Sequence, residues 1–124
     1  MASGKEEQPA GPVDRTSAEH YVWGGGRCDG WFLVQHPDLH VIEERMPPGT
    51  GEALHVHARA RQFFYVLAGH ARFTVNGQTV HVGQGQGLSI VPGTHHRVEN
   101  PGPADLTLLV ISHPPSHGDR TDVG

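Results

Sequence analysis

The chain has 124 residues, which is enough for one domain with a single hydrophobic core but not for two. Nine basic and thirteen acidic residues give a formal net charge of −4 without a stripe of Lys and Arg, so we expect neither nucleic acid nor an anionic membrane as a partner. No apolar run reaches the roughly 18 residues of a membrane span, and no charged-then-apolar leader is present, so we expect no spanning helix and no signal peptide. The single cysteine, Cys28, excludes an intrachain disulfide and indicates a cytoplasmic location.

Residues 1–17, MASGKEEQPAGPVDRTS, are polar, rich in Pro and Gly and nearly free of large apolar side chains. Such a segment cannot bury enough apolar surface to offset the entropy that it loses on ordering. We therefore predict a flexible N-terminal arm over residues 1–17 and a folded body over residues 18–113.

Short apolar runs follow one another through this body at the spacing of about 8 to 12 residues that is typical of an all-β sandwich or barrel. Asn76-Gly77, between FTV and QTVHV, is the strongest hairpin signal in the chain. No segment keeps an apolar period of 3.6 for about ten residues. The pattern therefore predicts an all-β fold, a jelly roll of two sheets. The strand-forming runs are HYVW, DGWFLVQ, LHVIEERM, ALHVH, RQFFYVLAG, HARFTVNG, QTVHVG, GLSIVP, HRVEN and DLTLLVISH.

Residues 114–124, PPSHGDRTDVG, form a polar C-terminal tail. The sequence leaves two alternatives for this tail. Either it trails over the surface, or Pro114 and Pro115 direct it along the folded body so that it is ordered.

Four residues have the spacing of a metal site. His55 and His57 are two apart, so on a strand both imidazoles project from the same face. Gln62 follows after a short turn, and the run VPGTHHRVEN offers a third imidazole. Three neutral nitrogens and one amide oxygen suit a divalent transition metal ion, and the sequence does not choose among Fe, Mn, Ni, Co, Cu and Zn.

The third imidazole belongs either to His95 or to His96, since adjacent residues on a strand point to opposite faces. The other histidines lie on strand faces or in loops without a partner at ligand spacing, and we interpret them as solvated or hydrogen-bonded imidazoles. They are His20, His36, His40, His70, His81, His113 and His117.

Two segments of the chain resemble the motifs of the cupin superfamily. The first motif, G-x5-H-x-H-x4-E-x6-G, is matched in spacing by Gly49, His55, His57, Gln62 and Gly69. The second, G-x5-P-x-G-x2-H-x3-N, is matched in spacing by Gly85, Val91, Gly93, His96 and Asn100. The resemblance covers residues 38–113 and implies a cupin barrel, with His55, His57, His96 and residue 62 as metal ligands.

The chain departs from the cupin pattern at two positions. Val91 stands where the family usually has Pro, which we expect to reshape only a turn. Gln62 stands where the family usually has Glu, so the metal would keep its full double charge and residue 62 could not take a proton. Besides direct coordination through its side-chain oxygen, one alternative is open, in which Gln62 orients a ligand histidine by a hydrogen bond.

Alternate residues of a strand share one face, and this predicts which residues line a substrate pocket. Phe64 and Val66 share the parity of Gln62, Val98 shares that of His96, and Phe73 lies on the next strand, although plain core packing is an alternative for each. A general acid or base could come from the run LHVIEERM. Alternation along that strand lets either Glu44, or Glu43 together with Arg45, face the interior. The alternative is that these charged side chains lie on a solvated face of the strand.

These residues favour a metal-dependent enzyme for a small organic substrate that is anionic or enolisable. It would be a dioxygenase or a Lewis-acid isomerase, lyase or cyclase, with Glu44 as the candidate catalytic residue. The alternatives are a non-catalytic module that binds or senses a metal and a small molecule, and a storage-like barrel with a vestigial site. The resemblance also implies a homodimer, for which Trp23 and Trp31 are candidate anchors if they do not cap the barrel.

Overall fold

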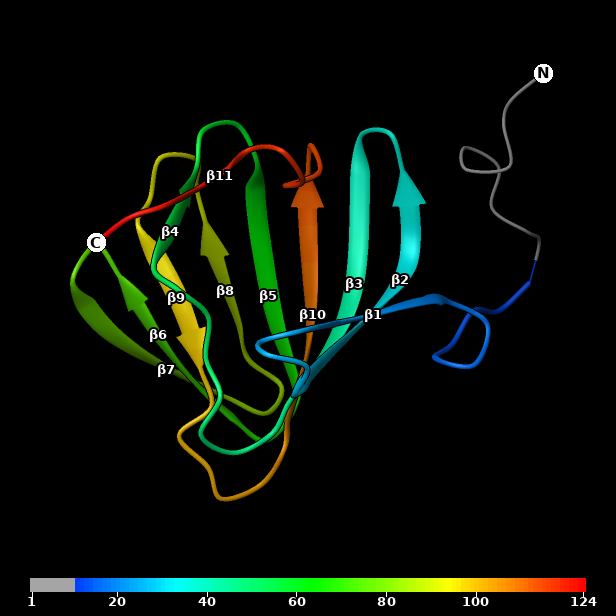
Figure 1. The fold of residues 1–124 in the computed structure, drawn as a ribbon, viewed down its shortest axis with the longest axis horizontal. Helices are drawn as coiled ribbons and strands as arrows, with labels where there is room; N and C mark the ends of the chain where they lie inside the picture. Colours follow the sequence, from blue (N-terminus) through cyan, green and yellow to red (C-terminus); the bar gives the residue numbers. More distant parts are fainter. Residues whose placement is uncertain (1–10) are drawn as a thin grey trace.

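The structure, a computed structural model, describes residues 11–124, which form eleven antiparallel β-strands in two sheets (Figure 1). The prediction of an all-β fold is confirmed. The part of the chain that the structure describes has no helix long and apolar enough to cross a membrane. Of the predicted flexible arm, residues 1–10 lie outside the described residues.

The larger sheet has six strands in the order β1-β2-β3-β10-β5-β8. Its strands are β1 (Glu19–Trp23), β2 (Cys28–His36), β3 (Leu39–Met46), β10 (Leu106–His113), β5 (Arg61–Ala68) and β8 (Gly87–Ile90). The central strand β10 alternates buried and less buried residues along its whole length, as a strand with one face on the core requires.

The smaller sheet has five strands in the order β11-β4-β9-β6-β7. Its strands are β11 (Arg120–Asp122), β4 (His55–His57), β9 (His96–Glu99), β6 (His70–Val75) and β7 (Gln78–Gly83). The predicted hairpin joins β6 to β7, and Asn76 and Gly77 have φ angles of 48° and 82° there. These positive φ angles are those of the tight turn that Asn-Gly favours.

The core fills the space between the two sheets. Phe73 and Val98 of the smaller sheet and Phe64, Val66 and Leu108 of the larger one are all buried in it. The rings of Phe64 and Phe73 meet edge to face with their centroids 5.0 Å apart. This aromatic contact ties β5 to β6 across the interior.

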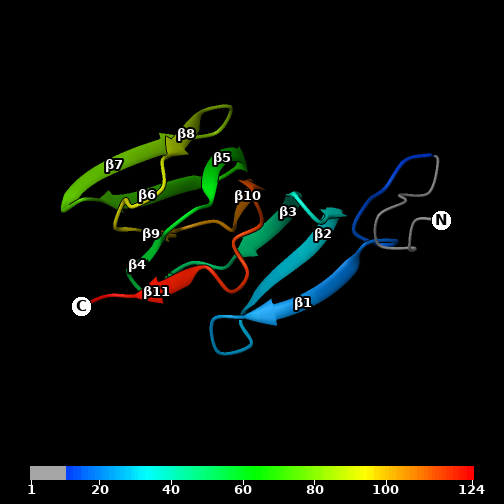
Figure 2. The same ribbon diagram turned by 90° about the horizontal axis from the view of Figure 1, so that it is seen from above.

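The C-terminal tail is ordered, so the second of the two alternatives for residues 114–124 is the observed one. After β10 the chain crosses to the smaller sheet, where β11 pairs with β4 (Figure 2). Arg120 is opposite His57, and Asp122 is opposite His55. The tail therefore lies directly beside the strand that carries the first two candidate ligands.

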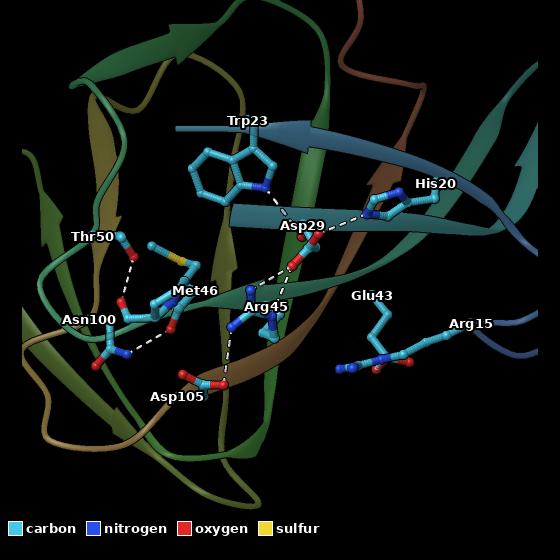
Figure 3. A network of polar contacts seen from close by, with 11 residues as sticks. Arg15, His20, Trp23, Asp29, Glu43, Arg45, Met46, Thr50, Asn100 and Asp105 are labelled. Carbon is cyan, nitrogen blue, oxygen red and sulfur yellow. Dashed lines mark hydrogen bonds and ion pairs between the residues drawn. The ribbon is translucent and has the colours of Figure 1, made fainter. Parts of the chain in front are cut away.

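A polar network, which we call the Asp29 network, joins His20, Asp29, Arg45 and Asp105 (Figure 3). The Asp29 carboxylate lies 2.8 Å from His20 Nε2 and accepts a hydrogen bond of 2.8 Å from Arg45 Nε. Arg45 also donates to the Asp105 carboxylate over 3.2 Å. Nearby, Arg15 of the expected arm pairs with Glu43 over 2.6 Å and covers the ring of Trp31, so this part of the arm contacts the sheet.

The motif residue Asn100 has a structural role. Its amide nitrogen donates to the carbonyl oxygen of Met46 over 2.7 Å (Figure 3). The same nitrogen donates to the carbonyl oxygen of Ala104, and the side-chain oxygen accepts from the amide of Gly102. The side chain is buried and every polar atom of its amide group has a partner. Asn100 thus holds the end of β3 against the loop before β10.

Candidate metal centre

Three histidines meet inside the barrel. His55 and His57 lie on one face of β4, and His96 on β9 is the pairing partner of His55. All three are buried, with His96 fully so, and each offers a nitrogen within 4.8 Å of the others. His95, next in the chain to His96, is exposed. The structure therefore brings His96 rather than His95 to the cluster.

Backbone carbonyls fix the tautomers of two of these rings. His55 Nδ1 lies 2.8 Å from the carbonyl oxygen of Ala53, and His96 Nδ1 lies 2.9 Å from that of Thr94. A carbonyl oxygen can only accept, so each Nδ1 carries the hydrogen and each Nε2 keeps its lone pair. This second hydrogen bond is the usual way in which metal-ligating histidines are oriented.

Gln62 of β5 completes the set. Its side-chain oxygen lies 3.1 Å from His96 Nε2, and its nitrogen donates to Ser112 Oγ over 3.1 Å. In this arrangement two lone-pair atoms face each other, and a cation held by both atoms would relieve the repulsion. Rotating the amide by half a turn instead makes Gln62 a hydrogen-bond donor to His96. The geometry thus accommodates both alternatives drawn from the sequence.

The donor set suits a divalent transition metal ion. Burial lowers the pKa of His55 to about 4 and also lowers the pKa values of His57 and His96. The three rings are therefore neutral at pH 7, which is the form that binds metal. Among the described residues, the buried His57 Nδ1 has no hydrogen-bond partner, which leaves a further nitrogen uncommitted. Three imidazoles and an amide oxygen with spare lone pairs fit such an ion.

A cavity of about 340 Å³ opens beside the cluster. Its polar wall includes Glu44 from β3, Glu52 from the segment before β4, Tyr21 from β1 and Arg120 from β11. Its apolar wall includes Trp23, Ile42, Phe64 and Val110, and the tail closes one side with Ser116, His117 and Gly118. Both sheets and the tail therefore contribute to one pocket.

Two carboxyl groups in this wall have raised pKa values. Burial raises the pKa of Glu44 to about 7, although Tyr21 donates a hydrogen bond of 3.3 Å to its Oε2. Burial, together with the charge of Glu44, raises the pKa of Glu52 to about 8. Burial likewise raises the pKa of Tyr21, so its hydroxyl stays protonated. Near neutral pH this side of the pocket can hold or release a proton.

Arg120 supplies a positive charge at the same wall. Its Nε donates to Asp122 over 2.7 Å, and its Nη1 lies 3.8 Å from Glu52. A guanidinium group presents five N–H donors, and the pair with the well exposed Asp122 does not use all of them. Arg120 can therefore also bind an anion in the pocket.

The structure gives different places to the other residues nominated from the sequence. Glu44 and Phe64 line the pocket. Glu43 and Arg45 make their ion pairs with Arg15 and with the Asp29 network. The remaining pocket candidates lie in the hydrophobic core and are not part of the cavity lining. They are Val66, Phe73 and Val98.

Sequence reasoning missed Tyr21, Glu52 and Arg120. Glu52 lies within the spacer of the first motif, three residues before His55, and this position was a usable signal. Arg120 gave no local signal, because its place in the pocket depends on the pairing of β11 with β4. Trp23, considered as a dimer anchor or a barrel cap, lies in the pocket wall.

Comparison with known proteins agrees with this geometry. Residues 42–112 match the family described as "Cupin domain". The chain belongs to the cupin family. The oxalate-binding protein of Thermotoga maritima is 33% identical over 93 residues, which cover 71% of this chain and 77% of that protein.

Two further similarities extend the range of relatives. A mannose-1-phosphate guanylyltransferase of Klebsiella pneumoniae is 34% identical over 86 residues, which are 69% of this cupin but only 18% of that enzyme. The polyketide cyclase RemF of Streptomyces resistomycificus superposes with a TM-score of 0.78 at 19% identity, over 94% of this chain and 87% of that one. The structural likeness shows a shared fold.

Proposed function

We propose that this cupin is a metal-dependent enzyme that moves a proton on a small anionic or enolisable substrate, as an isomerase, lyase or cyclase does. The observation that carries the proposal is a pocket in which candidate metal ligands lie together with proton-holding carboxyl groups and an arginine. The pocket is lined by His55, His57, Gln62, Glu44, Glu52 and Arg120, and His96 lies buried within ligand distance of the other two histidines. Pockets that combine perturbed carboxyl groups with a candidate metal site are typical of active sites.

His55, His57 and His96 would hold a divalent metal ion through nitrogen, with Gln62 as the fourth ligand through its amide oxygen. The ion would polarise a carbonyl or enolate oxygen of the substrate as a Lewis acid. Because Gln62 is neutral, it leaves the positive charge of the centre undiminished and takes no part in proton transfer. The proton-transfer group must therefore come from another part of the pocket.

Glu44 is the proposed general acid and base. Its pKa of about 7 keeps both protonation states populated near neutral pH, which is the condition for efficient proton transfer. The hydroxyl of Tyr21 donates to Glu44 Oε2 and orients the carboxyl group. Glu44 would take a proton from a substrate carbon and return it at another position. Arg120, in the same polar wall, would bind the substrate's negative charge.

The carboxyl groups of Glu44 and Glu52 in the pocket favour proton transfer over the dioxygenase alternative, which would need O₂ and no protein base. A non-catalytic binding module is the second candidate, because the relative from Thermotoga maritima is described as an oxalate-binding protein. That module would use the same histidines and Arg120 and would leave the bound molecule unchanged. The two candidates differ only in turnover.

Exchange of carbon-bound hydrogen in D₂O separates these possibilities. The metal-loaded protein would be incubated with a panel of 2-oxo acids, hydroxy acids and 1,3-dicarbonyls, followed by proton NMR with parallel measurement of O₂ uptake. We expect exchange that requires the metal and is largely lost in Glu44→Gln. Glu43→Gln is the matched control, since Glu43 pairs with Arg15 outside the pocket. O₂ uptake without exchange would support a dioxygenase, and binding with neither would support the binding module.

Two further proposals rest on the resemblance and on composition. We expect a homodimer and a cytoplasmic location, and light scattering of the purified protein tests the first. If the protein is a monomer at high concentration, the expected dimer is wrong.

A further inference from the structure

The carboxylate of Asp119 binds three consecutive backbone amides in the turn between two ligand-bearing strands. Its oxygens accept hydrogen bonds from the N–H groups of Ala58 (3.2 Å), Arg59 (3.0 Å) and Ala60 (2.8 Å). The side chain is only 4% exposed, although Asp119 lies about sixty residues further along the chain. These bonds hold the pKa of Asp119 below its usual range, so it is ionised at neutral pH.

This turn sets the relation between the candidate ligands. His57 ends β4, and Gln62 is the second residue of β5, so residues 58–60 are most of the connection between them. The two strands belong to different sheets, and no ladder pairs them directly. The separation of His57 from Gln62 therefore depends on the conformation of the turn. Three charge-assisted hydrogen bonds to one carboxylate fix that conformation.

Other contacts hold the tail without Asp119. β11 pairs with β4 over three residues, and the amide of Val123 donates to the carbonyl oxygen of Leu54. Replacing Asp119 therefore leaves a route for the tail to stay in place. The contribution that is particular to its carboxylate is the geometry of residues 58–60.

We propose that Asp119 is a positioning residue of the metal centre, which holds the turn so that Gln62 and the three histidines converge on one point. The proposal rests on the proposed metal-binding function of these four residues. Asp119 is not itself a candidate ligand, although its charge and its backbone lie close to His57. It acts through the backbone, and its loss would displace Gln62 relative to His57.

Metal binding to Asp119→Asn tests the proposal. This substitution keeps the size of the side chain but replaces one acceptor oxygen with an NH₂ group that faces backbone donors. Asp122→Asn is the matched control, because Asp122 lies three residues further along the chain in β11, its side chain is 64% exposed and, among the described residues, that side chain bonds only to Arg120. Co²⁺ affinity would be measured by chelator competition and the ligand field by visible absorption, with metal-free melting temperatures alongside.

We expect Asp119→Asn to weaken Co²⁺ binding by about tenfold or more and to change the absorption spectrum, as loss of a ligand-orienting partner commonly does. Asp122→Asn should bind as the wild type does. Asp119→Ser, a smaller side chain with one acceptor, gives a second reading if the Asn variant folds poorly.

Two results would overturn the inference, and they differ from each other. If the Asn variant melts at a lower temperature but binds Co²⁺ with unchanged affinity and spectrum, Asp119 is merely structural and the metal centre stands. If the wild type itself binds no Co²⁺, the proposed function fails and the positioning role fails with it.

Discussion

The Asp29 network and the histidine cluster are both rich in polar side chains, but the two regions differ in how many of their polar atoms have a hydrogen-bond partner. The Asp29 carboxylate has His20 and Arg45 as partners, and Arg45 reaches Asp105 as well. In the cluster, His55 has a hydrogen bond on Nδ1 only, His96 Nε2 faces the side-chain oxygen of Gln62, and within the described chain His57 Nδ1 has no partner. One region pairs its polar atoms, whereas the other leaves lone pairs free.

The pKa values show the same contrast. The hydrogen bond from His20 lowers the pKa of Asp29, because the partners stabilise the charged form. In the cluster, burial lowers the pKa of His55 and its neighbours, so the rings lose their charge and keep their lone pairs. A buried polar group without a partner costs stability unless something binds it. The cluster is therefore the better candidate for a binding site, and the Asp29 network for a structural one.

Replacing His96 with Ala should have the largest effect on metal binding. It removes one of three nitrogens and also the neighbour of the Gln62 oxygen. We expect the affinity for a divalent metal to fall by on the order of 100-fold or more, beyond the effect of losing an orienting partner. Elemental analysis and chelator competition measure this loss.

His95→Ala is the control for that experiment, since His95 comes directly before β9 and is exposed. Its metal content should equal that of the wild type. Equal metal loss in the two variants would mean that the cluster does not bind the metal through His96.

Asp29→Asn should show the opposite pattern. Losing the charge weakens the hydrogen bonds to His20 and Arg45, and we expect the free energy of unfolding to fall by about 1–2 kcal/mol, since the carboxylate is partly exposed. Metal affinity should not change. Urea denaturation and metal titration together test this separation, and a large loss of metal by Asp29→Asn would break the comparison between the two regions.

Gln62 allows a finer test of the cluster. Gln62→Glu should keep the metal and bind it more tightly by up to about tenfold, because a carboxylate oxygen adds Coulomb attraction at nearly the same volume. It should also weaken capture of azide or acetylacetone, because the charge of the centre falls from about +2 to +1. Gln62→Ala should lose metal affinity modestly. Titration of each variant with metal and then with anion measures these effects.

If the Glu variant captures anions as well as the wild type and the Ala variant holds metal undiminished, Gln62 is not a ligand. Its hydrogen bond to His96 would then be its role, with the amide rotated so that its nitrogen faces the ring.

The fold was predictable because it depends on local signals. Alternation and turn residues predicted an all-β fold, and Asn76-Gly77 predicted the observed hairpin. Spacing gave the cluster, because two residues two apart on a strand share a face, and the cupin resemblance chose His96 over its neighbour. Apart from the choice of His96, these inferences need only the period of a strand and the residues that favour turns.

The rest of the pocket depends on contacts between distant segments. Parity correctly grouped Val66 with Gln62 and Phe64, yet it could not tell which of them face the cavity and which fill the core. Arg120 and Asp119 lie in a tail that is held in place by the pairing of β11 with β4, and no local sequence pattern predicts that pairing. The pair of Tyr21 and Glu44 requires β1 and β3 to be placed together.

Glu44→Gln should give the smallest effect, a change in how stability depends on pH. The pKa of Glu44 is raised in the folded protein from its ordinary value of 4.5 to about 7, so its contribution to stability is fully present below pH 4.5 and is lost as the pH rises through about 7. Metal-free wild type should therefore lose more melting temperature between pH 5.5 and pH 8 than Glu44→Gln does. The histidines remain in both proteins, so their contributions largely cancel in the difference. The raised pKa of Glu52 depends partly on the charge of Glu44, so Glu52 loses less stability in the variant and adds to the difference in the same direction. Glu43→Gln, which changes a carboxylate outside the pocket, should follow the wild type, and the same pH profile for the wild type and the Glu44 variant would show that Glu44 carries no raised pKa and is not the proton-transfer group.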